Sequence, residues 1–279
     1  MPTLVTGCRG RVGSALVSLL HQGGHPVRAG SRHPGELSLP TGVPAVACDL
    51  GDPDTFAPAL DGVDSVFLYA EPSHVTEFLT AAQTAGVAHV VLLSSSSVLD
   101  PDARSNPIAA SHHAVEQALN DSPLTATLLR PGAFAGNAHQ WSESFRSGRP
   151  VELPYPHSAT SPIDEADIAD VAHAVLTDAR LRGSAYHLTG PESLTAAEQV
   201  GLLAAASGSP ATVRPVSRAA WKDAVSPFVP EEIAEALLDH WAATDGSPAE
   251  ITGETEKLTG RPARTFAAWA AEHAAAFRA

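Results

Sequence analysis

The stretch that decides the fold is Thr3-Leu4-Val5-Thr6-Gly7-Cys8-Arg9-Gly10-Arg11-Val12-Gly13, near the start of the chain. A short β-branched run leads directly into three glycines spaced three apart, and apolar residues at helical spacing follow them. Gly7 permits a tight turn, Gly10 lets a diphosphate approach the backbone, and Gly13 lets the helix lie near the sheet. The pattern predicts a dinucleotide whose diphosphate lies on the first amides of the helix. The alternative is a glycine-rich turn that has lost its ligand. The predicted contacts here are Gly7, Arg9, Gly10, Arg11, Val12 and Gly13.

Short apolar runs alternate with longer helical stretches over the first 130 residues. Strands are expected at 3–6, 27–29, 45–47, 65–69, 89–93 and 125–129. Strand, helix, strand at this rhythm implies right-handed crossovers and a parallel sheet covered on both faces. The sequence therefore predicts an α/β fold, a Rossmann-type doubly wound parallel sheet.

Beyond about Pro131 the pattern loosens into loops punctuated by glycine and proline. Helices are expected at 164–177, 195–206, 230–243 and 264–277. Thr195-Ala-Ala-Glu198 predicts a capping box at the start of the second of these. We divide the chain into a dinucleotide-binding core, 1–131, to which later segments can return, and a small α+β part, 132–279, for substrate binding and C-terminal helices.

Composition limits the possible partners. The 279 residues carry 17 Lys plus Arg against 31 Asp plus Glu, a formal charge of −14, which argues against nucleic acid as a main ligand. No apolar run is long enough to cross a membrane, and no basic leader is recognised at the start, so a cytoplasmic protein without a membrane partner is expected. Two cysteines form no disulfide framework, and the His112/His113 and His21/His25 pairs lack further ligands, so no metal site is expected. A homodimer or a protein partner stays open.

The residues after the second strand indicate which dinucleotide binds. The strand ends Val27-Arg28-Ala29-Gly30-Ser31-Arg32-His33, with no carboxylate before Glu36 to accept from the ribose hydroxyls of NAD. Arg32, with Ser31 beside it, is placed to bind a 2′-phosphate through charge-assisted bonds. NADP(H) is therefore favoured over NAD(H). Arg9 either adds to this pocket or is a solvated charge.

Further cofactor contacts are expected where the other strands end. Asp49-Leu50 is placed to meet the adenine edge, or alternatively forms a helix-capping turn with Asp52 and Asp54. Ser94 follows the fifth strand, also as a predicted cofactor contact. Tyr69-Ala70-Glu71 is expected beside the nicotinamide ribose, and Pro131-Gly132-Ala133-Phe134 behind the nicotinamide ring or its amide, with Pro131, Gly132 and Phe134 as the predicted contacts.

These motifs together resemble the NmrA-like, NAD(P)H-binding group of atypical short-chain dehydrogenases/reductases. The resemblance rests on the glycine-rich start, Ser31-Arg32, Asp49-Leu50, the serine run after the fifth strand and Leu129-Arg130-Pro131-Gly132-Ala133-Phe134, and it extends through 163–169 and 259–266. It implies a Rossmann domain with a small C-terminal substrate domain. Members include quinone and enone reductases, isoflavone-type reductases and redox-sensing regulators, so the fold and cofactor transfer better than the reaction.

The proton-relay pair of typical short-chain dehydrogenases, Tyr-X-X-X-Lys, has no match. The tyrosines Tyr69, Tyr155 and Tyr186 are followed four residues later by Ser73, Ala159 and Gly190, and the lysines are Lys222 and Lys257. Without that pair no nearby ammonium lowers the pKa of a phenol for proton transfer.

His112 and Glu116 occupy the helix where the pair is expected. They are four residues apart and share a helical face, so we expect Glu116 to orient the imidazole and raise its pKa. Similar proteins often carry His-X-X-X-Glu here, which favours a role near the nicotinamide; the alternative is a surface His/Glu pair. The resemblance also implies that Ser95 or Ser96 hydrogen-bonds the substrate carbonyl, unless these hydroxyls only form turns and caps.

The substrate pocket is expected among bulky or polar residues after the sheet. They are Phe134, Asn137, His139, Trp141 and Tyr155. An aromatic pocket suits a planar or apolar acceptor, but the same residues equally suit packing of the small part on the large one. The sequence predicts an NADPH-dependent oxidoreductase that passes hydride to a quinone, enone or ketone. The alternatives are a cofactor-binding redox sensor without turnover and a non-redox isomerase or cyclase.

Overall fold

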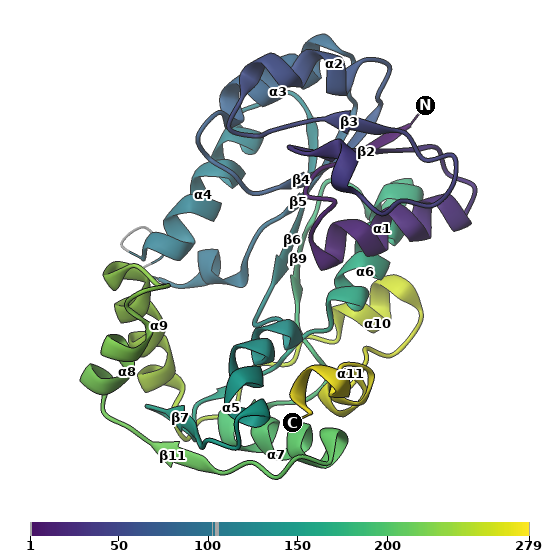
Figure 1. Cartoon of the computed structure of the whole chain (residues 1–279). Helices are drawn as coiled ribbons and strands as arrows, with labels where there is room; N and C mark the ends of the chain where they lie inside the picture. The colour runs from purple at the N-terminus through teal and green to yellow at the C-terminus, as the bar shows by residue number, and fades with distance from the viewer. Residues whose placement is uncertain (1, 102, 104–105, 279) are drawn as a thin grey trace.

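The computed structural model describes residues 2–101, 103 and 106–278. Its centre is a seven-stranded sheet in the order β3-β2-β1-β4-β5-β6-β9, with every neighbouring pair parallel (Figure 1). The strands are β1 (Thr3–Val5), β2 (Val27–Ser31), β3 (Ala45–Ala47), β4 (Ser65–Tyr69), β5 (His89–Leu93), β6 (Thr125–Pro131) and β9 (Ala185–Leu188). The chain order reverses between β1 and β4, which is the position where ligands bind in open α/β sheets.

Helices cover both faces of this sheet. α1 (Arg11–Gln22) and α6 (Glu165–Thr177) pack on one face. The other is covered by α2 (Phe56–Leu60), α3 (Val75–Thr84) and α4 (Pro107–Asn120). The predicted Rossmann-type doubly wound fold is confirmed.

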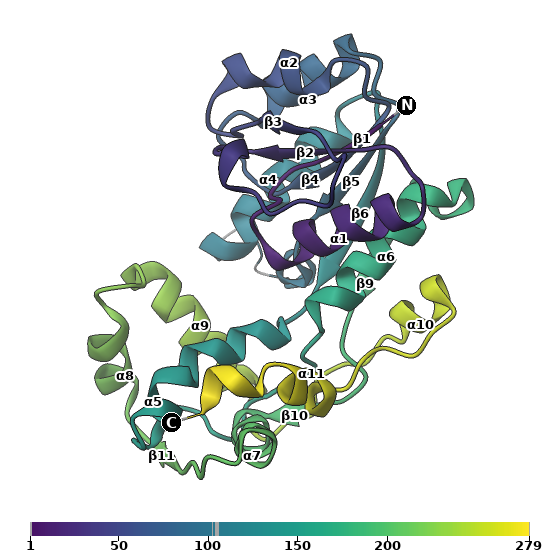
Figure 2. The ribbon, with the colours of Figure 1, turned by 45° about the vertical axis from the view of Figure 1, so that its right-hand side comes forward.

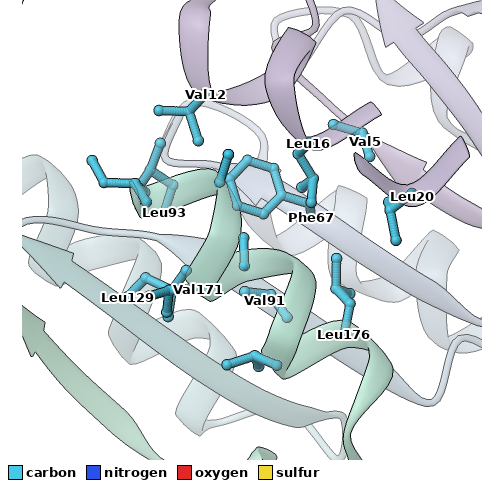
Figure 3. Close-up of a cluster of buried hydrophobic side chains, with 14 of the residues drawn as sticks. Val5, Val12, Leu16, Leu20, Phe67, Val91, Leu93, Leu129, Val171 and Leu176 are labelled. Carbon is cyan, nitrogen blue, oxygen red and sulfur yellow. The ribbon is translucent and has the colours of Figure 1, made fainter. Parts of the chain in front are cut away.

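The hydrophobic core explains why the central strands are mainly apolar. Alternate residues of a strand point to opposite faces, so Val5, Phe67 and Val91 pack beneath α1 and α6 (Figure 3). Their neighbours Leu4 and Val66 pack beneath α2 and α3. A strand buried on both faces has no position for a solvated side chain.

The chain after β6, apart from α6 and β9, forms a smaller unit beyond the carboxyl ends of the strands (Figure 2). Its elements are α5 (Ser142–Arg146), β7 (Val151–Leu153), β8 (Ala159–Thr160), β10 (Leu194–Thr195), α7 (Ala196–Ser207), β11 (Val213–Pro215), α8 (Arg218–Val225), α9 (Glu231–Thr244), α10 (Glu254–Thr259) and α11 (Phe266–Glu272). Phe145, Leu203 and Trp269 belong to its main cluster, and Trp221 and Leu238 to a second between α8 and α9. This unit therefore has hydrophobic clusters of its own.

Two details refine the expected elements of this region. The capping box is confirmed, because Thr195 Oγ1 accepts from the Glu198 amide at 3.1 Å and Glu198 Oε2 accepts from the Thr195 amide at 2.7 Å. The helix expected at 264–277 is shorter, because the hydroxyl of Thr265 caps it and Phe266 is its first residue. It ends at Glu272, and a 3₁₀ helix, Ala274–Phe277, follows.

Candidate functional site

The glycine turn lies at the carboxyl end of β1, where the strand order reverses. Gly7 has φ +67°, a left-handed conformation that glycine adopts without strain. A Cβ on Gly13 would lie 2.6 Å from the Gly7 carbonyl oxygen, so the start of α1 fits this turn only as glycine. Thr6 joins the ends of two strands, since its hydroxyl donates to the Phe67 carbonyl at 3.1 Å and accepts from the Tyr69 amide at 2.8 Å. The close approach of Gly7 and Gly13 and the two hydrogen bonds of Thr6 therefore hold the turn beside β4.

The first turn of α1 fits a diphosphate. Gly10 is the N-cap residue, and no side chain caps the helix in the described part of the chain. The first amides of a helix have no partner within it, and they carry the positive end of the helix dipole. Such a helix start binds phosphate groups. Tyr69, which is 54% exposed, borders the turn at Gly7.

The end of β2 carries the predicted 2′-phosphate residues. Arg32 is exposed, whereas Ser31 is buried and its hydroxyl accepts from the His33 amide at 3.1 Å. Glu36, the first carboxylate after the strand, pairs with Arg9 at 3.2 Å. Both of these side chains are more than half exposed, so this pair adds little stability. The positive charge of Arg32 therefore lies where the strand ends.

The turn after β3 is stabilised by its own acidic residues. Asp49 Oδ1 accepts from the Gly51 amide at 3.0 Å, and Asp52 Oδ1 accepts from the Asp54 amide at 3.2 Å. The structure thus shows these aspartates in the turn and cap that the sequence offered as the alternative. The contact of Asp49-Leu50 with adenine stays a prediction. Leu50 packs partly against the core beneath α2 and α3.

The two cysteines lie buried near the same end of the sheet. Burial raises the pKa of the Cys8 thiol to about 12, and it does the same for Cys48. Both thiols are protonated at neutral pH, and a thiol in that state is a poor nucleophile. Neither residue suits covalent chemistry.

Glu116 is bound by groups other than His112. Its carboxylate accepts from the Ser94 hydroxyl at 2.6 Å and from Arg130 in a bidentate pair, Nε to Oε1 at 2.9 Å and Nη2 to Oε2 at 2.6 Å. The expectation that Glu116 orients His112 is therefore wrong, because both carboxylate oxygens are already engaged. Ser94 is buried, its amide donates to the Leu129 carbonyl at 2.8 Å and its hydroxyl donates to Glu116, so its contact with the cofactor stays a prediction. The three residues join the ends of β5 and β6 to α4.

His112 has an environment that keeps it neutral. Its Nδ1 is buried without a hydrogen-bond partner in the described part of the chain. Burial lowers the pKa of His112, and the charge of Glu116 only partly opposes this. The expected rise of its pKa is thus corrected to a fall. A neutral imidazole carries one N–H donor and one acceptor nitrogen.

The serines after β5 have different surroundings. Ser95 caps the 3₁₀ helix Ser96–Leu99, and its hydroxyl oxygen accepts from the Ser97 amide at 3.2 Å. Ser96 Oγ lies 3.8 Å from the position a Cβ would take on Gly132. Ser96 thus faces the segment after β6 that is predicted to back the nicotinamide, whereas Ser95 stabilises the turn.

Two neighbouring segments hold the backbone after β6. The Gly132 amide donates to the Leu188 carbonyl at 2.9 Å, the Ala135 amide donates to the Ile163 carbonyl at 2.8 Å, and the Ile163 amide donates to the Ala133 carbonyl at 2.9 Å. The strand β9 and the residues before α6 therefore fix this loop. Phe134 packs partly against the core beneath α1 and α6.

The aromatic residues predicted to wall a substrate pocket pack on three different hydrophobic clusters. Phe134 packs on the sheet core, Trp141 on the main cluster of the small unit, and Tyr155 on the cluster between α8 and α9. Asn137 is exposed. His139 stacks on Phe277, with ring centroids 5.5 Å apart. Packing therefore accounts for the aromatic members of this set.

Comparison with known proteins identifies the family. The NAD(P)H-binding family profile matches residues 7–179, from the glycine turn to the end of α6. The chain belongs to this NAD(P)H-binding family. It is 37% identical to (4-alkanoyl-5-oxo-2,5-dihydrofuran-3-yl)methyl phosphate reductase of Streptomyces griseus subsp. griseus, over 98% of each chain. It is 35% identical to NAD(P)H azoreductase of Xenophilus azovorans, over 99% of each.

A solved structure has the same fold. The crystal structure of NADPH-dependent quinone oxidoreductase from Escherichia coli complexed with NADPH matches with a TM-score of 0.80 at 24% identity, covering 97% of this chain and 99% of that one. Among the residues described, no helix has the length and apolar character needed to span a bilayer.

Sequence reasoning missed two charged residues of this site. Arg130 was part of a motif but had no predicted partner, and Glu165 was read only as the start of a helix. Glu165 Oε1 accepts from Arg11 Nη1 at 3.1 Å, across 154 residues of sequence. No local spacing links such residues, because their proximity arises from the packing of α1 on α6.

Proposed function

We propose that this chain is an NADPH-dependent reductase that transfers hydride to a small conjugated or carbonyl acceptor, such as a quinone, an enone or a ketone. The observation that carries the proposal is the fit of the Gly7–Gly13 turn and the uncapped start of α1 to a diphosphate. Relatives over nearly the whole chain are named a reductase and an azoreductase, which supports reduction as the activity.

The proposed preference for NADPH rests on charge at the end of β2. Arg32 is exposed there, and the carboxylate of Glu36 is already paired with Arg9. A guanidinium binds a phosphate through parallel charge-assisted bonds, whereas an NAD site needs a free carboxylate for the ribose hydroxyls.

In the proposed mechanism the bound cofactor supplies the hydride, and the protein supplies orientation. The amides of α1 would bind the diphosphate, and the loop after β6 would back the nicotinamide. The Glu116–Arg130 pair keeps the ends of β5 and β6 at a fixed distance from α4. Ser96 donates its hydroxyl to the acceptor oxygen, and His112 in its imidazolium form gives the proton that this oxygen receives, after which the neutral imidazole regains a proton from solvent.

Consumption of NADPH with a panel of quinones, enones, ketones and azo dyes tests this function. Steady loss of the reduced-nicotinamide absorbance with at least one acceptor is expected. Tight binding of both redox forms without consumption by any acceptor would refute the enzyme and support a cofactor-binding regulator instead.

The role of His112 has its own test with a neighbouring control. His112→Gln should lower kcat and remove a pH-dependent step from its profile, whereas His113→Gln should leave both unchanged. Full turnover of His112→Gln across the pH range would return this residue to a structural role.

A further inference from the structure

An ion pair lies beside the helix start that we assign to the diphosphate. Arg11 is the first residue of α1, and Glu165 is the first residue of α6. Arg11 Nη1 donates to Glu165 Oε1 at 3.1 Å, and the Arg11 side chain is 48% exposed whereas that of Glu165 is 8% exposed. The carboxylate is thus fixed inside the protein, and the guanidinium extends from it towards solvent.

The backbone at Gly136 confines this pair from a third direction. A Cβ on Gly136 would overlap Glu165 Oε1 and Arg11 Nη1, so a side chain at this position would displace the ion pair. The segment that contains Gly136 follows the loop predicted to back the nicotinamide, and the Ala135 amide binds the Ile163 carbonyl just before Glu165. Three segments that border the proposed cofactor therefore converge on one salt bridge.

The two partners use their hydrogen-bonding capacity unequally. Glu165 Oε2 is buried and has no partner among the described residues. Arg11 has five N–H donors in a planar fork, and the structure shows one of its nitrogens bound to Glu165. Arg11 is the first residue of the helix whose amides would bind the diphosphate. Its other guanidinium nitrogens can therefore donate to a second anion, such as that diphosphate.

We propose that Glu165 sets the affinity for the cofactor by neutralising Arg11 at the diphosphate site. The inference rests on the proposed function, since it requires a dinucleotide on α1. A fixed negative charge behind Arg11 weakens the attraction between Arg11 and the diphosphate, and it thereby speeds release of the oxidised cofactor after each turnover. Glu165 acts through Arg11 and is a positioning residue, not a catalytic one.

Calorimetric titration of Glu165→Gln with NADP⁺ tests this inference. The substitution removes a negative charge that is separated from the diphosphate by the length of the Arg11 side chain. With the effective dielectric constant of a partly exposed site, NADP⁺ binding is expected to tighten by about tenfold. The dissociation rate should fall correspondingly, and the difference from the unsubstituted protein should shrink at high salt. Adenosine 2′-monophosphate, which lacks the diphosphate and the nicotinamide, should show unchanged affinity in competition measurements.

Controls separate the charge from the fold. Glu152→Gln removes the carboxylate of the exposed Arg214–Glu152 pair on β11 and β7, and it should not alter NADP⁺ binding. Glu165→Asp keeps the charge and should remain within about twofold of the unsubstituted protein, because a small displacement of a charge changes its Coulomb energy at this range much less than removal does. Arg11→Gln should weaken NADP⁺ binding and also lower the melting temperature, because it leaves the buried Glu165 carboxylate without its charged partner.

Two results would overturn the inference. One is NADP⁺ affinity in Glu165→Gln equal to or weaker than that of the unsubstituted protein, and the other is an equal gain for adenosine 2′-monophosphate. Failure of the unsubstituted protein to bind NADP⁺ at all would instead refute the proposed function, so the two failures are distinguishable.

Discussion

Gly13→Ala is the substitution that tests the packing of the glycine turn most sharply. The added Cβ would lie 2.6 Å from the Gly7 carbonyl oxygen, 3.0 Å from the Gly7 carbonyl carbon and 3.1 Å from the Cys8 Cα. Carbon–oxygen contacts normally lie at about 3.3 to 3.6 Å, so the turn and the helix must separate by roughly 0.7 to 1 Å. All three contacts are backbone atoms, and no flexible side chain can move aside.

The magnitude follows from two opposing effects. Alanine is about 1 kcal/mol better than glycine inside a helix. Overpacking a buried site costs about 1 to 3 kcal/mol, so Gly13→Ala should be destabilised by up to about 2 kcal/mol. Gly201 is the matched control, because it lies in α7 with nothing within 4 Å of its added Cβ. Gly201→Ala should be stabilised by up to about 1 kcal/mol.

Differential scanning calorimetry and NADPH titration together measure both effects. The melting temperature should fall by up to about 6 °C in Gly13→Ala and rise slightly in Gly201→Ala. NADPH affinity should fall by at least about tenfold in Gly13→Ala alone, because the helix amides no longer lie at the same distance from the turn. Equal stability of the two variants, together with unchanged NADPH binding, would refute the close packing of Gly13 on Gly7.

Three further predictions concern charge. Arg32→Ala should reduce the preference for NADPH over NADH by about tenfold or more, since a charge-assisted pair is lost, and an unchanged ratio of the two KM values would disprove the 2′-phosphate assignment. Arg130→Met should lower the free energy of unfolding, measured by urea denaturation, by about 3 to 5 kcal/mol, because it leaves Glu116 buried without its charged partner. The control Arg180→Met, at an exposed pair, should change this free energy by less than about 1 kcal/mol. Burial lowers the pKa of His89 from 6.5 to about 4. The stability that the neutral imidazole contributes is therefore complete above pH 6.5, and about 3 kcal/mol of it is lost as the pH falls towards 4. His89→Gln should flatten this part of a plot of unfolding free energy against pH.

The sheet could be predicted from sequence where both of its faces are buried. The strand His89–Leu93 has all five residues buried, and its expected bounds match the structure because an apolar β-branched run has no other stable position. β9 was not predicted as a strand, because Ala185 is exposed and Tyr186 and His187 are only partly buried at the sheet edge. Its pairing with β6 joins segments far apart in the chain, which no local pattern reveals.

The site was predictable in its backbone and less so in its side chains. The glycine spacing indicated both the turn and the start of α1, because these requirements are local. Helical spacing placed His112 and Glu116 on one face, but the carboxylate binds Arg130 because a guanidinium offers two parallel charge-assisted bonds. Such choices depend on tertiary contacts, as the Arg11–Glu165 pair also shows.

Calorimetric titration of the unsubstituted protein with NADPH, and separately with NADH, tests the central claim most directly. We expect saturable binding of one nucleotide per chain, with higher affinity for NADPH than for NADH. Both affinities should fall as salt screens the phosphate contacts. Absence of measurable binding for both nucleotides would contradict the assignment of the α1 helix start to the diphosphate.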